Sequence, residues 1–291
     1  MTMSGGAAPP VMVETADLDR ARNAGPMKVR RRWGRRLLTA FAALVFLWLF
    51  APLINIVIFT FNKPAGRRNL SWNEFTLENW SQPFKDTDLT SAFMRSLLVS
   101  AVAVSVALVL GSLMAIALSR YRFTGSKVTE IFLVLPLTTP EIVLGASLYQ
   151  LFLGTNTTLG FSTIVIAHIM FCLSFVVVTV KARLQSLDPR LEEAAQDLYA
   201  GPSSTFWRVT FPLVLPGIVS AALLSFSLSF DDFIITNFVS GDTNTFPKFV
   251  YVSYLRGIPA QANVIGFSLF LFAVLLVILG QVIGSRRRSA A

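Results

Sequence analysis

Three carboxylates lie within long apolar runs of the sequence, where a charged side chain is costly. Glu141 follows Pro136 and Pro140 in one run, and Asp231 and Asp232 are adjacent in another. A carboxylate near the centre of a bilayer costs about 2.5–3.5 kcal/mol or more, so such residues usually face a cavity or a cationic partner. Prolines at this depth are tolerated where the backbone lines a cavity. We therefore predict that these carboxylates line a pathway for a cation.

Small polar residues extend the two aspartates into two stripes on a helix. One stripe consists of Ser225, Ser229, Asp232 and Thr236, and the other of Ser220, Ser227 and Asp231. At about 3.6 residues per turn the stripes lie about 100° apart, so the two aspartates need not face the same space. We expect the first stripe, with Asp231 and Glu141, to line the pathway. The alternative is that an aspartate caps a helix break near the outer surface or pairs with Arg95 or Arg256.

Other polar residues of these runs have structural explanations. His168 is the only histidine, and we expect it to form an interhelical hydrogen bond rather than to relay protons. Cys172 is the only cysteine, which excludes an internal disulfide and a cysteine-based metal cluster and predicts a small buried residue. Lys248 and Arg256 are expected to be ordinary charges of an outer loop.

A second candidate site is a short charged segment between two apolar runs, LEEAAQDLYAGPSSTFWRVTFPLVLPG, residues 191–217. Asp188 and Pro189 favour the start of a helix, and Gly201 with Pro202 favours its end and the start of a second. The first helix carries one apolar stripe, at the spacing expected for a helical face; its members are Leu191, Ala194, Ala195 and Leu198. So short a helix is marginal alone, and its apolar face lacks the large anchors of a membrane-surface helix. We expect it to dock into a groove of a cytoplasmic protein.

The elements that position these residues are six apolar runs, each long enough to cross a bilayer. The chain has 291 residues, of which 54% are hydrophobic and 14% charged, and its mean hydropathy is +0.62. The runs are approximately 37–61, 92–118, 128–152, 161–180, 213–238 and 264–283. The third is interrupted by its two prolines. This composition predicts an all-α integral membrane protein rather than a soluble domain.

Basic residues predict the orientation of the runs. They concentrate in four segments that fall on one side of the membrane when six runs cross it: residues 28–36, 120–127, 181–208 and 286–288. By the positive-inside rule, both termini and the charged segment are cytoplasmic. The net charge of +9 and the pI of about 10.2 therefore reflect topology, and we expect no nucleic-acid partner.

The sequence predicts five parts. Residues 1–27 are expected to be a disordered cytoplasmic tail, and residues 28–36 a basic juxtamembrane segment. Residues 37–283 form the six-helix transmembrane domain, which contains a cytoplasmic loop at 181–212, and residues 284–291 form a basic tail. The long apolar run after the basic segment argues against a cleaved signal peptide.

The charged segment resembles the EAA loop of membrane subunits of binding-protein-dependent ABC importers. Glu193, Ala194 and Ala195 match the head of that motif, and Val209 and Pro212 match its tail. Two positions depart from it: Tyr199 stands where the family has glycine, and Phe211 replaces leucine. Because the motif glycine is missing, we expect Gly201 to supply the bend.

The resemblance implies the type I ABC importer permease fold (MetI-like), with the loop acting as a coupling helix seated in an ATP-hydrolysing subunit. It implies that the coupling residues are Glu192, Glu193, Ala194, Ala195, Asp197, Tyr199 and Gly201. The chain has no G-x-x-x-x-G-K-[ST] phosphate loop, so it is not itself an enzyme, and ATP and Mg²⁺ would be bound by partner subunits. We expect no catalytic residue, metal or cofactor in this chain.

Two further stretches, PLTTPEIVLG and SLSFDDFIITNFVSG, are similar to the spermidine/putrescine branch of that family, in its second membrane subunit. This implies import of polyamines across a bacterial inner membrane. It implies as partners a second, different permease subunit, two ATPase subunits, an extracytoplasmic solute-binding protein and membrane lipid.

Alternative functions remain open at this point. An importer of the same type for a sugar, thiamine, an iron chelate or an oxyanion would carry the same charged segment, although an oxyanion route should contain Arg or Lys, which run 213–238 lacks. A secondary transporter should show inverted repeats of broken spans, and none is evident. A non-transporting scaffold would leave the charged segment unexplained.

Overall fold

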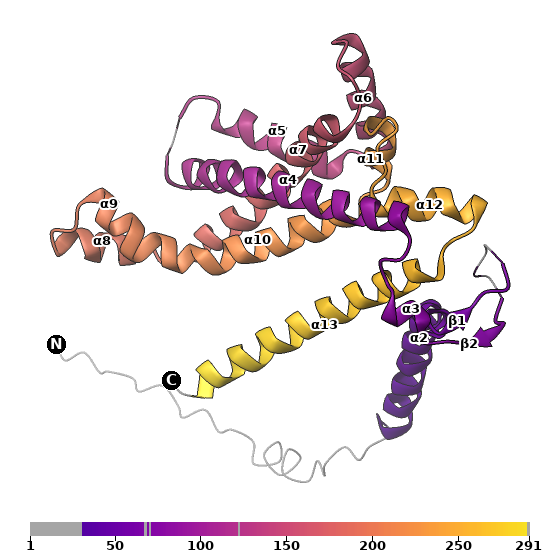
Figure 1. Cartoon of the computed structure of the whole chain (residues 1–291). Helices are drawn as coiled ribbons and strands as arrows, with labels where there is room; N and C mark the ends of the chain where they lie inside the picture. The colour runs from indigo at the N-terminus through magenta and orange to yellow at the C-terminus, as the bar shows by residue number, and fades with distance from the viewer. Residues whose placement is uncertain (1–30, 67–68, 70, 122, 290–291) are drawn as a thin grey trace, which may run out of the picture. The chain divides into compact units, whose positions relative to one another are not determined.

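The computed structural model describes residues 31–66, 69, 71–121 and 123–289, and this part of the chain is almost entirely helical (Figure 1). In chain order, its elements are α2 (Arg31–Thr60), β1 (Asn62–Lys63), β2 (Glu74–Phe75), α3 (Glu78–Ser81), α4 (Thr87–Arg120), α5 (Ser126–Thr138), α6 (Glu141–Gly154), α7 (Phe161–Gln185), α8 (Arg190–Asp197), α9 (Pro202–Thr205), the π-helix η1 (Phe206–Thr210), α10 (Phe211–Asp231), α11 (Ile234–Val239), α12 (Phe246–Arg256) and α13 (Ala260–Ser289). The two strands form a small antiparallel hairpin.

Most of the predicted apolar runs are single helices. Within the described residues, five helices are long and apolar enough to cross a membrane: 36–60, 87–120, 161–185, 202–231 and 260–278. A sixth crossing exists only if α5 and α6 count as one span, and these two helices are bent by 109°. The prolines thus do more than interrupt run 128–152, because the chain changes direction at Thr139–Pro140. The chain is a multi-pass membrane protein.

Two other predicted boundaries differ from the structure. Run 213–238 is not one helix, since α10 ends at Asp231 and α11 begins at Ile234. The last predicted run, 264–283, extends further than expected, because α13 continues as one helix to Ser289 and includes most of the residues predicted as a basic tail. The predicted disordered tail, residues 1–27, and residues 28–30 of the basic segment lie outside the described residues.

The chain divides into two units. The first extends to Asn55 and, where described, consists of the larger part of α2, an apolar helix with Pro52 inside it. The second begins at Ile56 and contains every other element. Its hairpin is held to α3 by a buried asparagine, Asn79, whose Nδ2 donates to the carbonyl oxygens of Thr60 and Asn62, each at 2.9 Å.

The core of the second unit surrounds α7, which packs against α4, α10, α5 and α11. Figure 1 shows α4 and α7 running side by side. Small residues let these helices approach closely, as is usual between helices in membranes. A Cβ atom on Gly111 of α4 would lie 2.7 Å from a side-chain carbon of Val176 on α7, and one on Gly145 of α6 would lie 2.7 Å from the ring of Phe238 on α11. Both contacts therefore require glycine.

Candidate functional site

The charged segment folds into two short helices, α8 and α9, as predicted. Asp188 lies two residues before the first, and its Oδ1 accepts a hydrogen bond from the backbone N–H of Arg190, the first residue of α8, at 3.0 Å. No side chain of α8 is buried within the described chain, and Leu191 and Leu198 are 46% and 82% exposed. The apolar stripe thus lacks a partner within the described chain, which is the geometry expected of a face that docks on another protein.

The two adjacent glutamates of α8 have different environments. Glu192 is turned inward: its Oε1 accepts from Nη2 of Arg120 at 2.6 Å and from the hydroxyl of Thr210 at 2.8 Å. This carboxylate joins α8 to the end of α4 and to η1. Glu193 is exposed, and no hydrogen bond or ion pair of its carboxylate is found among the described residues. Glu192 therefore holds α8 to other parts of this chain, whereas the carboxylate of Glu193 is available to a partner protein.

The bend after α8 lies at Tyr199, which corrects the expectation that Gly201 supplies it. Tyr199 has a left-handed φ of 60°, whereas Gly201 is extended with φ −67°. The N–H groups of Tyr199 and Ala200 donate to the carbonyl oxygens of Gln196 at 2.8 Å and Ala195 at 3.0 Å. These two bonds form the Schellman ending that usually carries glycine at this position. Tyr199 therefore adopts the left-handed conformation that the motif glycine would take, and its side chain is 99% exposed.

The segment connects directly to the membrane helix that contains α10. Residues 202–231 form one long apolar rod, in which α9, η1 and α10 follow one another without a break. The rings of Phe206, Trp207 and Phe211 contact one another around the π-helical turn. Nε of Arg183, at the end of α7, donates to the carbonyl oxygen of Leu213 at 2.9 Å. A displacement of α8 and α9 would therefore reach both α10 and α7.

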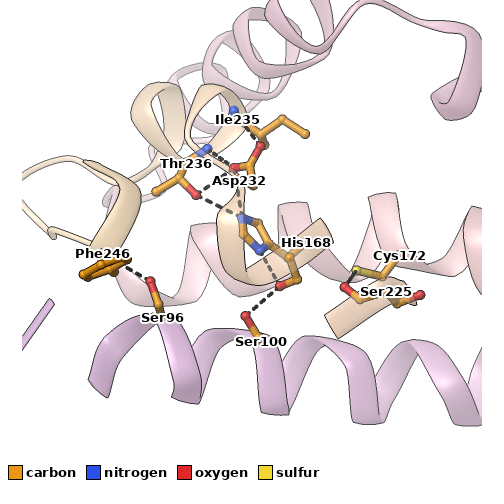
Figure 2. A network of polar contacts seen from close by, with 10 residues as sticks. Ser96, Ser100, His168, Cys172, Ser225, Asp232, Ile235, Thr236 and Phe246 are labelled. Carbon is orange, nitrogen blue, oxygen red and sulfur yellow. Dashed lines mark hydrogen bonds and ion pairs between the residues drawn. The ribbon is translucent and has the colours of Figure 1, made fainter. Parts of the chain in front are cut away.

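The stripe with Asp232 is buried between the helices of this chain (Figure 2). Ser225, Ser229 and Thr236 are at most 3% exposed. His168 of α7 lies between the last two, with Nδ1 2.8 Å from the hydroxyl oxygen of Ser229 and Nε2 3.0 Å from that of Thr236. The hydroxyl of Ser229 also donates to Ser100 of α4 at 3.2 Å. The predicted interhelical role of His168 is confirmed, and its hydrogen bonds join α7 to α10 and α11.

Asp232 closes this network and caps the helix break. Its Oδ2 accepts from the N–H and the hydroxyl of Thr236, each at 2.8 Å, and its Oδ1 accepts from the N–H of Ile235 at 3.3 Å. Nε2 of His168 lies 3.3 Å from the same carboxylate. These contacts match the alternative considered for the aspartates, in which one of them caps a helix break. Both oxygens of the Asp232 carboxylate therefore have partners within this chain.

Asp231, unlike Asp232, has an exposed side chain. It is the last residue of α10, is exposed, and lines a cavity together with Ser227 of the same predicted stripe. No hydrogen bond or ion pair of its side chain is found among the side chains that the structure describes. Arg95, one proposed partner, is exposed on α4 and forms no ion pair with it; the side chain of Arg256 lies outside the described part. Of the two aspartates, Asp231 is the one without a partner among the described side chains.

Glu141 is the first residue of α6, immediately after the 109° bend. A carboxylate in the first turn of a helix is favoured by the helix dipole. Its side chain is exposed, and no hydrogen bond or ion pair joins it to either aspartate. The structure therefore does not combine Glu141 with the aspartates into one contact network.

Lys248 is wrongly predicted as an ordinary loop charge. It is only 9% exposed, and its Nζ donates to the hydroxyl of Ser240 and the carbonyl oxygen of Gly241, each at 2.7 Å. Burial lowers the pKa of Lys248, against a smaller opposing effect of Asp242. The lysine thereby ties α12 to the end of α11. Cys172 is buried as predicted, and its Sγ lies 3.6 Å from the carbonyl oxygen of Ser225.

Sequence reasoning also missed Arg120, Thr210 and Ser100. Arg120 was counted only as a topological charge, and the other two were not considered. Each acts through a partner at least 18 residues away along the chain. No local pattern could have indicated these pairs.

Comparison with known proteins gives concordant matches. Residues 107–289 match the family described as "Binding-protein-dependent transport system inner membrane component". The chain is 35% identical over 248 residues to the spermidine/putrescine transport system permease protein PotC of Haemophilus influenzae, which covers 85% of this chain and 96% of that protein. It is 36% identical over 240 residues to the putrescine transport system permease protein PotI of Escherichia coli, covering 80% of this chain and 84% of that protein.

Two solved structures have a similar fold at low sequence identity. A bacterial ABC transporter involved in the import of alginate matches with a TM-score of 0.63 and 18% identity, covering 89% of this chain and 99% of that one. An inward-facing MetNI methionine ABC transporter matches with a TM-score of 0.52 and 19% identity, over 68% of this chain and 93% of that one. These likenesses concern the fold alone, and they agree with the permease fold implied by the resemblance in sequence.

Proposed function

Because the chain belongs to the family of binding-protein-dependent transport system inner membrane components, we propose that this permease subunit imports polyamines, spermidine or putrescine, at the expense of ATP. The observation that carries the proposal is the 35% identity to a spermidine/putrescine permease, which extends over 96% of that protein. An intramembrane carboxylate suits such a cargo, since a polyamine carries several ammonium groups. At an effective dielectric constant near 20, one carboxylate about 4 Å from one ammonium gains about 4 kcal/mol before desolvation.

In this proposal α8 is the helix that an ATPase subunit binds. Its exposed stripe and the free carboxylate of Glu193 support this assignment, and so do the motif residues Ala194, Ala195 and Asp197. The contacts of Glu192 with Arg120 and Thr210 hold α8 on the ends of two other helices. Nucleotide-driven movement of the ATPase subunits would then be transmitted to α4 and α10.

The remaining partners follow from the same proposal. The complex would contain a second, different permease subunit, two ATPase subunits that hold ATP and Mg²⁺, and an extracytoplasmic solute-binding protein. It would lie in a bacterial inner membrane with both termini of this chain in the cytoplasm. Ser225, Ser229, Asp232 and Thr236 would stabilise the helix bundle, while Asp231 and Glu141 remain candidates for the pathway.

The test is uptake by the complete complex reconstituted in liposomes with its binding protein. We expect ATP-dependent accumulation of labelled spermidine or putrescine, and none of a sugar or an oxyanion. Uptake of a sugar or an oxyanion without polyamine uptake would assign the complex to another branch of the family. Polyamine flux driven by an ion gradient without ATP would overturn the proposal.

A further inference from the structure

The end of α7 that precedes the charged segment carries two cationic side chains, Lys181 and Arg183, which contact different helices. Two positions along a helix correspond to about 200° around its axis, so the two side chains leave α7 on nearly opposite faces. Nζ of Lys181 donates to Oε1 of Glu130 on α5 at 2.6 Å. Nε of Arg183 donates to the carbonyl oxygen of Leu213 on α10 at 2.9 Å. The last turns of α7 are thus fixed to a helix on either side.

The contact of Arg183 lies at a weak point of α10. Pro216 is inside this helix. A proline within a helix removes one backbone hydrogen bond and crowds the carbonyl group four residues before it, here that of Pro212. Helices bend at such positions. A displacement that enters α10 from α8 and α9 would therefore be taken up by bending at Pro216, unless the turns before and after this proline were held together.

The side chain of Arg183 contacts α10 on both sides of this proline. Its Nε is bonded to Leu213, which precedes Pro216, and its aliphatic stem packs on Gly217, which follows it. A Cβ atom on Gly217 would lie 2.6 Å from both Cβ and Cγ of Arg183, so this close contact requires glycine. Gly217 is buried and Arg183 is half-buried. One side chain thus fixes the turns before and after Pro216 to α7.

We propose that Arg183 is a positioning residue for ATP-coupled transport. It keeps α10 from bending at Pro216 and ties this helix to α7, and Lys181 extends the connection to α5. A movement of the charged segment then displaces α10, α7 and α5 together, and α5 leads directly into the 109° bend before α6. The proposal rests on the proposed function and deepens it, since it names the side chains through which a movement of the ATPase subunits would reach helices that do not contain the charged segment.

The first test measures ATP hydrolysis and uptake of labelled spermidine in one preparation, the complete complex reconstituted in liposomes with its binding protein. Arg183→Met keeps an unbranched stem on Gly217 but removes the N–H donor. We expect hydrolysis to continue and the spermidine imported per ATP to fall about tenfold, because a hydrogen bond from a charged donor is lost. Arg183→Gln places an amide nitrogen at the chain position of Nε, so its ratio should stay within about threefold of the wild type.

A second test leaves Arg183 in place and displaces it from α10. Gly217→Ala puts a methyl group where the stem of Arg183 lies, and it should lower the same ratio about tenfold. Adding Arg183→Met to Gly217→Ala should change the ratio little further, because both variants break one contact. The matched control is Gly280→Ala on α13, where an added Cβ meets no atom within 4 Å. Lys127→Met removes an exposed cation from α5 and controls for the loss of charge; both controls should leave the ratio unchanged.

The outcomes separate this proposal from the proposed function. ATP-dependent uptake of polyamine by the wild-type complex tests the function, and the ratio of uptake to hydrolysis in the variants tests the positioning role. If the wild type imports polyamine and neither Arg183→Met nor Gly217→Ala lowers the ratio, the positioning role is overturned and the function stands. If yield, hydrolysis and uptake fall in parallel, the ratio is again unchanged; Arg183 then only stabilises the fold, and the positioning role is likewise overturned.

Discussion

Glu192 and Arg120 form an ion pair at 2.6 Å although they are 72 residues apart in the chain. Their side chains are 22% and 26% exposed, so the pair is largely shielded from water. The same carboxylate oxygen of Glu192 accepts from Thr210. The pair fixes the base of α8 on the end of α4 and thereby orients the exposed face that carries Glu193.

Removing either partner of this pair should destabilise the purified complex. We expect Arg120→Gln or Glu192→Gln to cost about 1.5–3 kcal/mol, because each leaves a partly buried charged group without its partner. The double variant should cost clearly less than the sum of the two. A double-mutant cycle of unfolding free energies measures this coupling, and strictly additive effects would show that the pair contributes nothing.

The exposed face of α8 should be needed for coupling but not for insertion. Glu193→Ala removes a free carboxylate, and Ala195→Asp adds a charge to the apolar stripe. Both variants are expected to abolish ATP-coupled uptake. Membrane insertion and yield should stay at the wild-type level. Gln196→Ala, on the same helix, is the control. Full transport in either of the first two variants would contradict the assignment of α8.

Replacing Tyr199 by glycine should stabilise the end of α8. Tyr199 has φ 60°, and a left-handed conformation costs a residue with a Cβ about 1–2 kcal/mol. Part of this gain is offset by the greater freedom of glycine in the unfolded chain. We expect slower hydrogen exchange of the α8 amides in Tyr199→Gly and faster exchange in Tyr199→Val. If Tyr199→Gly exchanges faster than the wild type, the tyrosine ring makes a contact that outweighs its backbone strain.

The two adjacent aspartates should differ in what their neutralisation affects. Asp232→Asn is expected to lower the free energy of unfolding by about 1.5–3 kcal/mol, because the buried carboxylate accepts three hydrogen bonds. The yield of assembled complex should fall as well. Asp231→Asn should leave assembly intact. Thermal unfolding and co-purification of the partner subunits measure the difference. Equal assembly in both variants would contradict the capping role of Asp232.

Lys248 should make stability depend on pH in the alkaline range. Burial lowers its pKa in the folded protein below the ordinary value of 10.5, so the unfolded chain binds the proton more readily. Its contribution to stability therefore rises with pH between the folded pKa and 10.5. We expect the wild type to gain stability relative to Lys248→Met as the pH rises through this window. A difference that is flat or falls with pH would contradict the burial effect.

The features that the sequence predicted correctly are local. Apolar runs must lie in a membrane or a core wherever they pack, so the main helices and the long α13 follow from composition. Asp188 accepts from the first N–H of α8 because an aspartate side chain reaches the nearby N–H groups of its own chain. Cys172 and His168 lie within apolar runs, and burial there requires either packing or a hydrogen-bonded partner.

The tertiary structure decided what surrounds each of these residues. Helical periodicity gave the angle between the stripes of Asp231 and Asp232, but it could not say which stripe faces His168, 64 and 68 residues before Asp232 and Thr236 in the chain. Likewise, no local pattern separates Glu192 from Glu193 until Arg120 is brought beside one of them. The physical reason is that the cost of a charge in an apolar region depends on the partners supplied by distant segments, and only the folded chain assembles those partners.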